Sequence, residues 1–193
     1  MNVQLDLRMD KSEFLTWVQA HEGRYELAGS RVVMMTGGSR GHAILVRRLA
    51  AALEKRLDAN RWTVLTSDFG VDFGPSTVRY PDVVVDVAGG RLKDLTATAP
   101  AVIAEVISPS SVKDDLGPKA DEYPRLPCLP AYLVLAQDEP RARVWVRGAT
   151  GFAREPKVIE GHDGVIEIPS LGIDLPLPEI YAGGEYRSSG GGM

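Results

Sequence analysis

The spacing of apolar residues predicts a short helix near the start of the chain. Asp10 and Glu13 stand three residues apart, which is the spacing of a capping box. Apolar side chains then recur at helical intervals, at Phe14, Trp17 and Val18. We therefore expect a helix over about residues 10–20.

A β-hairpin and a long helix are predicted next. Two segments, Tyr25–Leu27 and Val32–Met35, flank a turn at residues 28–30, as in a hairpin. From His42 to about Leu57 the pattern is strongly helical. Its apolar side chains form one stripe, made by Val46, Leu49, Leu53 and Leu57. This helix should therefore bury one face.

The middle of the chain is expected to form strands. Five candidates follow the long helix: Trp62–Phe73, Arg79–Val87, Ala101–Ser108, Ala131–Gln137 and Arg141–Arg147. The second, third and fourth are nearly continuous apolar runs, which is typical of strands covered on both faces. A helix over about 111–125 is expected to join the third and fourth. Helices and strands alternating in this way predict an α/β (α+β) fold.

The pattern weakens after Gly148. Val165–Ile168 is a candidate short strand, and Leu171–Pro178 is expected to be extended because it is rich in proline. Neither an internal repeat nor a linker divides the chain, so we expect one domain over residues 1–180. Residues 181–193 end in a Gly- and Ser-rich segment and are expected to form a flexible tail.

Composition favours an ordinary globular protein. Apolar residues make up 44% of the chain and charged residues 25%. The single cysteine, Cys128, allows no internal disulfide. No apolar run approaches the roughly 20 residues that cross a membrane, and the N-terminus lacks the layout of a secretion signal. We expect a cytoplasmic protein with no membrane contact.

The net charge of −4, from 22 basic and 26 acidic residues, bears on nucleic-acid binding. Proteins that hold nucleic acid by charge alone usually carry a basic excess. If this chain binds nucleic acid, the contact must be local, transient or assisted by metal ions.

Two carboxylates stand within apolar strand patterns. Asp82 opens one run, and Glu105 shares a strand face with Ile103 and Ile107. Burying an ionised carboxylate is costly unless a counter-charge or a cation offsets it. If the two strands are neighbours, both carboxylates point at one spot. That arrangement suits Mg²⁺, or Mn²⁺, because Mg²⁺ binds one or two carboxylates together with waters and phosphate oxygens.

A positive group would complete such a site. Lys119 lies just downstream, within the helix expected over about 111–125, which should pack against these strands. A lysine reaching back to the carboxylates would orient an attacking water and neutralise charge that develops on a phosphate. Cation, carboxylates and lysine together are suited to phosphodiester hydrolysis.

These residues resemble a known family, the Uma-two-type putative restriction endonucleases of the PD-(D/E)XK nuclease superfamily. The resemblance covers about residues 10–147, and its motifs are Tyr25-Glu26-Leu27, Val32–Met35, His42, Ser67–Val71, Arg79–Val84, Glu105–Ser110, and the spacing of Asp115, Lys119 and Tyr123. It implies a restriction-endonuclease-like fold, with a mixed central β-sheet flanked by helices and an N-terminal helix and hairpin. It also implies a divalent metal and a DNA substrate.

One position departs from the superfamily pattern. A lysine usually follows the glutamate by two residues, but this chain has Ile107 there. The resemblance supplies Lys119 as a migrated replacement. The segment 128–135 also differs from the Gly-Val and Tyr-Trp-Leu-Val-Asp that the family usually shows.

The three main candidates each have an ordinary structural alternative. Asp82 could cap a turn, Glu105 could pair with an arginine such as Arg79, and Lys119 could be a solvated helix lysine.

Two further residues are secondary candidates. Glu26 could add a metal or water contact, or it could pair with Arg24 or Arg31. His42 could be a ligand, or it could be a helix-start or core histidine. The glycine-rich segment 37–41 lacks the ending of a phosphate-binding loop, and we interpret it as a flexible connection near substrate.

Three functions remain open. The leading hypothesis is a metal-dependent DNA endonuclease, with Asp82 and Glu105 as ligands and Lys119 as the activating cation. The alternative is a non-catalytic protein of this fold, binding nucleic acid or serving as an assembly subunit. The third is a hydrolase that uses two carboxylates on sugars; it needs the pair in an open cleft, and their placement in apolar strands disfavours it. A homodimer is a further expectation, formed through the hairpin at Val32–Met35 if that hairpin is exposed.

Overall fold

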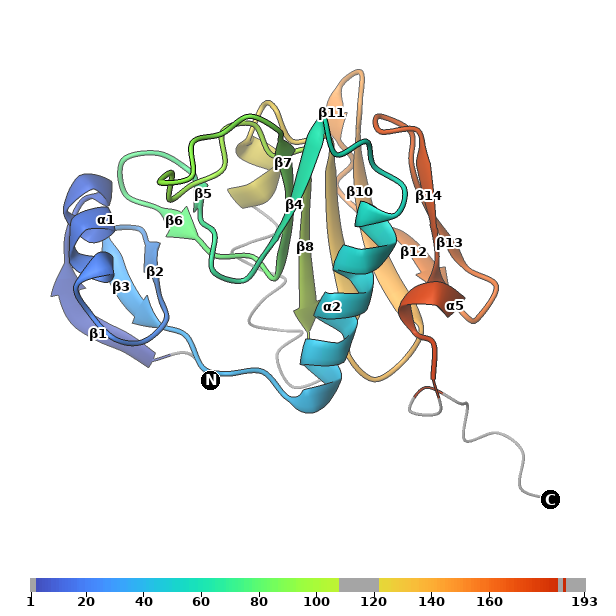
Figure 1. Ribbon diagram of the computed structural model, residues 1–193, viewed down its shortest axis with the longest axis horizontal. Coiled ribbons are helices and arrows are strands. Elements are labelled where there is room, and N and C mark those ends of the chain that lie inside the picture. Colours follow the sequence, from blue (N-terminus) through green and yellow to red (C-terminus); the bar gives the residue numbers. More distant parts are fainter. Residues whose placement is uncertain (1–2, 108–121, 184–185, 187–193) are drawn as a thin grey trace.

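A central mixed β-sheet forms the frame of the protein (Figure 1). The structure is a computed structural model and describes residues 3–107, 122–183 and 186. The strands of this sheet are β4 (Trp62–Thr66), β7 (Val83–Val87), β8 (Val102–Ile107), β9 (Ala131–Ala136), β10 (Arg141–Gly148), β11 (Gly151–Phe152) and β12 (Lys157–Glu160). Their order is β11-β10-β9-β8-β7-β4, and β12 also pairs with β10. β8 and β9 run parallel, whereas the other neighbouring pairs described are antiparallel.

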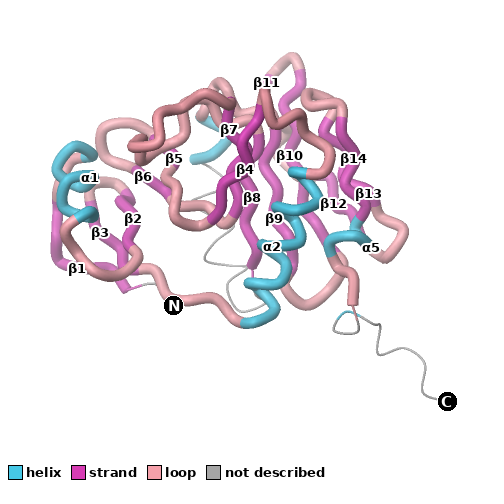
Figure 2. Tube along the Cα trace, viewed as in Figure 1, coloured by secondary structure: helices cyan, strands magenta, loops and turns pink. Residues whose placement is uncertain are grey.

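A smaller N-terminal sheet lies to one side of the central sheet (Figure 2). It contains β1 (Val3–Arg8), β2 (Tyr25–Ala28), β3 (Arg31–Met34), β5 (Val71–Asp72) and β6 (Val78–Arg79) in the order β1-β3-β2-β6-β5. Helix α1 (Lys11–Gln19) packs on it through the fully buried Phe14. Asp10 and Glu13 form the predicted capping box, each bonded to the backbone N–H of the other.

The predicted hairpin is present, but it is not an exposed edge. β3 lies between β1 and β2, so both of its sides are paired within the chain. The expectation that Val32–Met35 offers a free edge to a second copy is therefore wrong, because residues 3–8 form a strand that the sequence pattern did not predict.

Helix α2 (Arg40–Glu54) covers one face of the central sheet (Figure 1). Its predicted stripe is confirmed: Val46, Leu49 and Leu53 are buried, and Leu57 packs beside them after the helix ends. This core includes the side chains of β8 that alternate toward the helix, Val102, Ala104 and Val106. The opposite face of the sheet carries a second cluster with Ile103, Ile107 and three aromatic rings, Tyr123, Tyr132 and Trp145.

Two of the predicted strands are each divided between the two sheets. The predicted strand Trp62–Phe73 is β4 followed by β5, with a break at Ser67, whose φ is 42°. The predicted strand Arg79–Val87 is β6 followed by β7, with a break at residues 80–82. The chain thus crosses between the sheets at Ser67 and again at Asp82, and the backbone N–H of Ser67 donates to the carbonyl of Asp82.

The C-terminal part packs against the core beyond residue 180, where the sequence predicted the domain to end. β13 (Val165–Ile168) and β14 (Ile173–Pro176) form a hairpin, followed by α5 (Leu177–Ile180). Tyr181 and Tyr186 are buried in the same cluster as α2. The helix predicted over about 111–125 falls mostly outside the described residues, and its described end is a 3₁₀ turn, η1 (Tyr123–Arg125). No helix in the described ranges is long and apolar enough to span a bilayer.

Candidate active site

Asp82 and Glu105 lie opposite each other on adjacent strands. β7 and β8 pair with Val83 opposite Ala104, and continuing this antiparallel register by one residue sets Asp82 opposite Glu105. Residues opposite each other in such a pair project from the same face, with Cβ atoms roughly 4.5–5.5 Å apart. The backbone N–H of Val106 also donates to Oδ2 of Asp82 at 2.8 Å. The structure therefore brings the two predicted carboxylates together.

His42 holds Asp82 from the side of the helix. Its Nε2 lies 3.1 Å from Oδ2 of Asp82 and must donate, because an ionised carboxylate only accepts. The hydrogen bond to Asp82 raises the pKa of His42 above its usual value; burial opposes this shift, and the charges of Asp82 and Glu105 add to it. The backbone N–H of His42 donates to Ser39, the residue that caps α2. His42 is thus a helix-start residue and a partner of Asp82 at once.

Glu105 is buried under the aromatic cluster. Glu105 is only 6% exposed, and the hydroxyl of Tyr123 donates to its Oε1 at 2.6 Å. Burial, with the charge of Glu105, raises the pKa of Tyr123 well above its usual value, so this hydroxyl stays a donor. Sequence reasoning noted the spacing of Tyr123 but did not predict this contact.

Arg79 bonds to two acidic residues beside this cluster. Its Nε and Nη2 donate to the two carboxylate oxygens of Glu122, and its Nη1 donates to Oε1 of Glu26, all at 2.9 Å. Burial alone would lower the pKa of Arg79, but the bonds to Glu122 and the charge of Glu26 raise it overall. The partner of Glu26 is therefore Arg79, and not Arg24 or Arg31 as the alternative interpretation expected.

Glu26 keeps one oxygen buried without a hydrogen bond. Its Oε2 has no partner among the described residues, and the residue is 3% exposed. The charge of Glu26 also contributes to the raised pKa of Tyr123, after burial and the charge and hydrogen bond of Glu105.

The cation of the predicted site is not visible in the described part of the chain. Lys119 lies outside the described residues. Ile107, which stands where the superfamily usually has its lysine, is an apolar side chain buried in the aromatic cluster. No three His, Cys, Asp or Glu side chains in the described ranges gather closely enough to hold a metal ion. Two carboxylates alone still fit Mg²⁺, which usually keeps several waters and takes phosphate oxygens as further ligands.

The mixed central sheet, with α2 on one face, belongs to the restriction-endonuclease-like class of fold. A solved structure from Anabaena variabilis ATCC 29413, described as a putative nuclease belonging to DUF820, has the same fold. It superposes with a TM-score of 0.71 and 13% identity over 90% of this chain and 98% of that one.

The chain belongs to the Uma2 family, described as putative restriction endonucleases, whose sequence model matches residues 12–178. The resemblance inferred from the motifs is thus confirmed, and it extends past residue 147. Among its relatives is the uncharacterized protein slr1290 of Synechocystis sp., 25% identical over 91% of this chain and 93% of that protein. A second, sll1609 of the same organism, is 26% identical over 65% of this chain and 73% of that protein.

Proposed function

We propose that this protein is a Mg²⁺- or Mn²⁺-dependent endonuclease that hydrolyses phosphodiester bonds in DNA. The observation that supports this most strongly is the register of β7 and β8, which sets Asp82 opposite Glu105. Two adjacent carboxylates repel each other unless one is protonated or a cation lies between them. A divalent cation satisfies both and gives the pair a function.

The chain's own residues fix the two proposed ligands in place. Val106 and His42 both bond to Oδ2 of Asp82, and Oδ1 has no hydrogen bond to a described residue, so Oδ1 is the oxygen available to a metal. Tyr123 fixes the Glu105 carboxylate through Oε1. A metal bound there would polarise a phosphoryl oxygen and acidify a bound water. Lys119 is proposed to orient the attacking water and to neutralise charge on the phosphate.

The test is metal binding and DNA cleavage by matched variants. Asp82→Asn and Glu105→Gln keep side-chain shape but remove the charge, and Asp174→Asn does the same to an exposed carboxylate on β14. We expect wild type and Asp174→Asn to bind Mn²⁺ in calorimetry and to cleave circular DNA with Mg²⁺ or Mn²⁺ but not with EDTA. Asp82→Asn and Glu105→Gln should lose both Mn²⁺ binding and DNA cleavage, while their circular dichroism spectra stay those of the folded wild type. Cleavage at the wild-type rate by either variant would refute the proposal.

A second candidate function is nucleic-acid binding without catalysis. The observation that favours it is Ile107, an apolar residue at the position where the superfamily usually has its lysine, buried at 4% exposure. In that case wild type binds DNA but releases no product with any divalent metal.

A homodimer also stays a prediction, and sedimentation of the purified protein would test it.

A further inference from the structure

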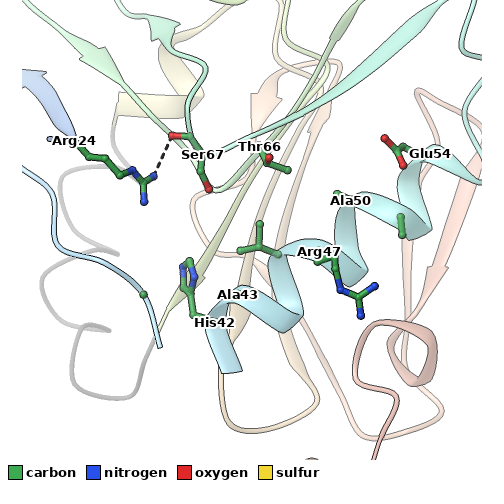
Figure 3. Close-up of a pocket in the computed structure, with 11 residues that line it drawn as sticks. Arg24, His42, Ala43, Arg47, Ala50, Glu54, Thr66 and Ser67 are labelled. Atoms are coloured by element: carbon green, nitrogen blue, oxygen red, sulfur yellow. Dashed lines mark hydrogen bonds between the residues drawn. The ribbon is translucent and has the colours of Figure 1, made fainter. Parts of the chain in front are cut away.

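A groove runs along α2 beside the carboxylate pair (Figure 3). Its volume is about 440 Å³, and it lies between the helix, the end of β4 and Arg24, which precedes β2. His42 lines one end of the groove and also bonds to Asp82. The groove therefore opens next to the proposed active site.

Two guanidinium groups line this groove. Arg47 is exposed on α2 and makes no hydrogen bond or ion pair with a described residue. Arg24 donates from Nη2 to the carbonyl of Ser67 at 3.1 Å, and its Nε forms a long ion pair of 3.7 Å with Oδ1 of the exposed Asp68; its side chain is still 40% exposed (Figure 3). Arginine is well suited to phosphate because its planar fork offers several donors and stays charged.

The rest of the lining leaves room for a chain to lie in the groove. Besides Val46, the helix contributes the small side chains of Ala43, Ala50 and Ala51, and Gly38 lines the groove from the segment before it. Thr66 and Ser67 add polar groups from the end of β4. Apolar floor and cationic walls match the sugar and phosphate groups that alternate along a nucleic-acid strand.

We infer that this groove binds the sugar–phosphate backbone of one nucleic-acid strand beside the scissile bond, with Arg47 and Arg24 contacting its phosphates. The inference rests on the proposed function and names where that function's substrate is held. It explains how a chain of net charge −4 can hold a polyanion, because the contact is confined to a local pair of cations.

Glu54 allows a test in which two charge-neutralising substitutions should change binding in opposite directions. It lines the same groove, is exposed, and makes no ion pair with a described residue. Arg47 and Glu54 are seven residues apart on one helix face, or roughly 10 Å along the axis at the rise per residue of an α-helix. A strand lying in the groove is attracted by Arg47 and repelled by Glu54, so neutralising the two should have opposite effects.

The experiment measures binding of a labelled single-stranded oligonucleotide in EDTA, over a series of salt concentrations. Arg47→Gln should weaken binding several-fold and reduce the slope of log K against log[salt] by about 1. Glu54→Gln should tighten binding. Arg154→Gln is the matched control, an exposed arginine between β11 and β12 at the far edge of the sheet, and it should bind as wild type. Equal effects of Arg47→Gln and Arg154→Gln, or no tightening by Glu54→Gln, would overturn the inference.

Competition identifies the ligand, and the absence of metal separates this test from the nuclease test. The competitors are a nucleoside monophosphate, inorganic phosphate and poly-glutamate, each compared with unlabelled oligonucleotide at an equal concentration of phosphate or carboxylate groups. If any of them displaces the labelled oligonucleotide equally well, binding of a nucleic-acid backbone is contradicted. Asp82→Asn and Glu105→Gln should bind the oligonucleotide even if they cannot cleave it. If wild type proves inactive, the EDTA measurements still decide the groove; if Arg47 proves irrelevant, metal-dependent cleavage can still stand.

Discussion

Gly38 determines where the His42 side chain can lie. A Cβ placed on Gly38 would come within 2.6 Å of Nδ1 and 2.8 Å of Cγ of the His42 ring. Cγ is the ring atom nearest the backbone, so the whole ring has to rotate to relieve that contact. Such a rotation would break the bond from Nε2 to Asp82, which is the main cause of the raised pKa of His42.

We therefore predict that Gly38→Ala lowers the pKa of His42 toward its usual value near 6.5. The measurement is an NMR titration of the imidazole resonances of the protein's three histidines. Gly37→Ala is the control, because a Cβ there meets no atom within 4 Å. An unchanged titration of His42 in Gly38→Ala would mean that the bond to Asp82 survives a displaced ring.

The candidate site was predictable to the extent that strand alternation determines it. Asp82 and Glu105 could be paired from sequence because each interrupts an apolar strand pattern, and two such strands tend to be neighbours. The partners of Arg79 could not be predicted, because Glu26 and Glu122 lie 53 and 43 residues away and only the closed fold brings them together. The role of Lys119 stays a prediction.

Among the elements, α5 is attached to the end of α2 by charge as well as by apolar packing. Arg56 and Lys55 both bond to the carboxylate of Glu179 on α5. The hydrogen bond from Arg56 lowers the pKa of Glu179 below its usual 4.5, although burial opposes the shift. The side chain of Glu179 is about a third exposed, at 32%, so solvent screening keeps the stabilisation below about 1 kcal/mol.

The sign of its pH dependence follows from the lowered pKa. The stabilisation is fully present above the unfolded value near 4.5 and is lost as pH falls through the folded value. Glu179→Gln should therefore reduce the free energy of unfolding at pH 7 but much less at pH 3, as measured by urea denaturation. Glu155→Gln, at an exposed glutamate without an ion pair to a described residue, should have no effect at either pH. An equal loss at both pH values would indicate packing as the cause.

The elements that sequence analysis predicted well are those with a single period. α1 and α2 begin within two residues of their predicted starts, because a capping box marks the first and an apolar stripe marks the second. The breaks at Ser67 and at residues 80–82 were missed. Where the chain crosses from one sheet to the other, the residues before and after the break both follow an apolar strand pattern, so the pattern does not mark the break. β1 was missed because its residues are mostly exposed, so no buried face marks it.

At the scale of the whole molecule, Arg79 connects the two sheets. It lies on β6 in the small sheet, where it bonds to Glu26 of the neighbouring β2. It also binds Glu122, which precedes η1, and Tyr123 of η1 packs against the central sheet. Arg79 and Glu26 are both buried, so removing one partner leaves a buried charge without compensation.

We predict that Arg79→Met lowers the free energy of unfolding by about 3–5 kcal/mol, the usual cost of breaking a buried ion pair. Because the lost bonds join the sheets, hydrogen exchange should accelerate more in peptides from residues 10–36 than in those from β8 and β9. Chemical denaturation and exchange mass spectrometry measure the two effects. Arg91→Met is the control, since Arg91 pairs with Asp94 at the surface with its side chain 76% exposed.

A double variant separates charge from packing in the same experiment. Replacing both partners, as Glu26→Leu with Arg79→Met, removes the uncompensated carboxylate and should recover a large part of the lost stability, because buried ion pairs can often be exchanged for apolar side chains of similar volume. If the double variant is as unstable as Arg79→Met alone, the loss comes from the bonds to Glu122 rather than from the buried charge of Glu26. If exchange accelerates equally in both sheets, the two sheets unfold as one unit that Arg79 stabilises without being their connection.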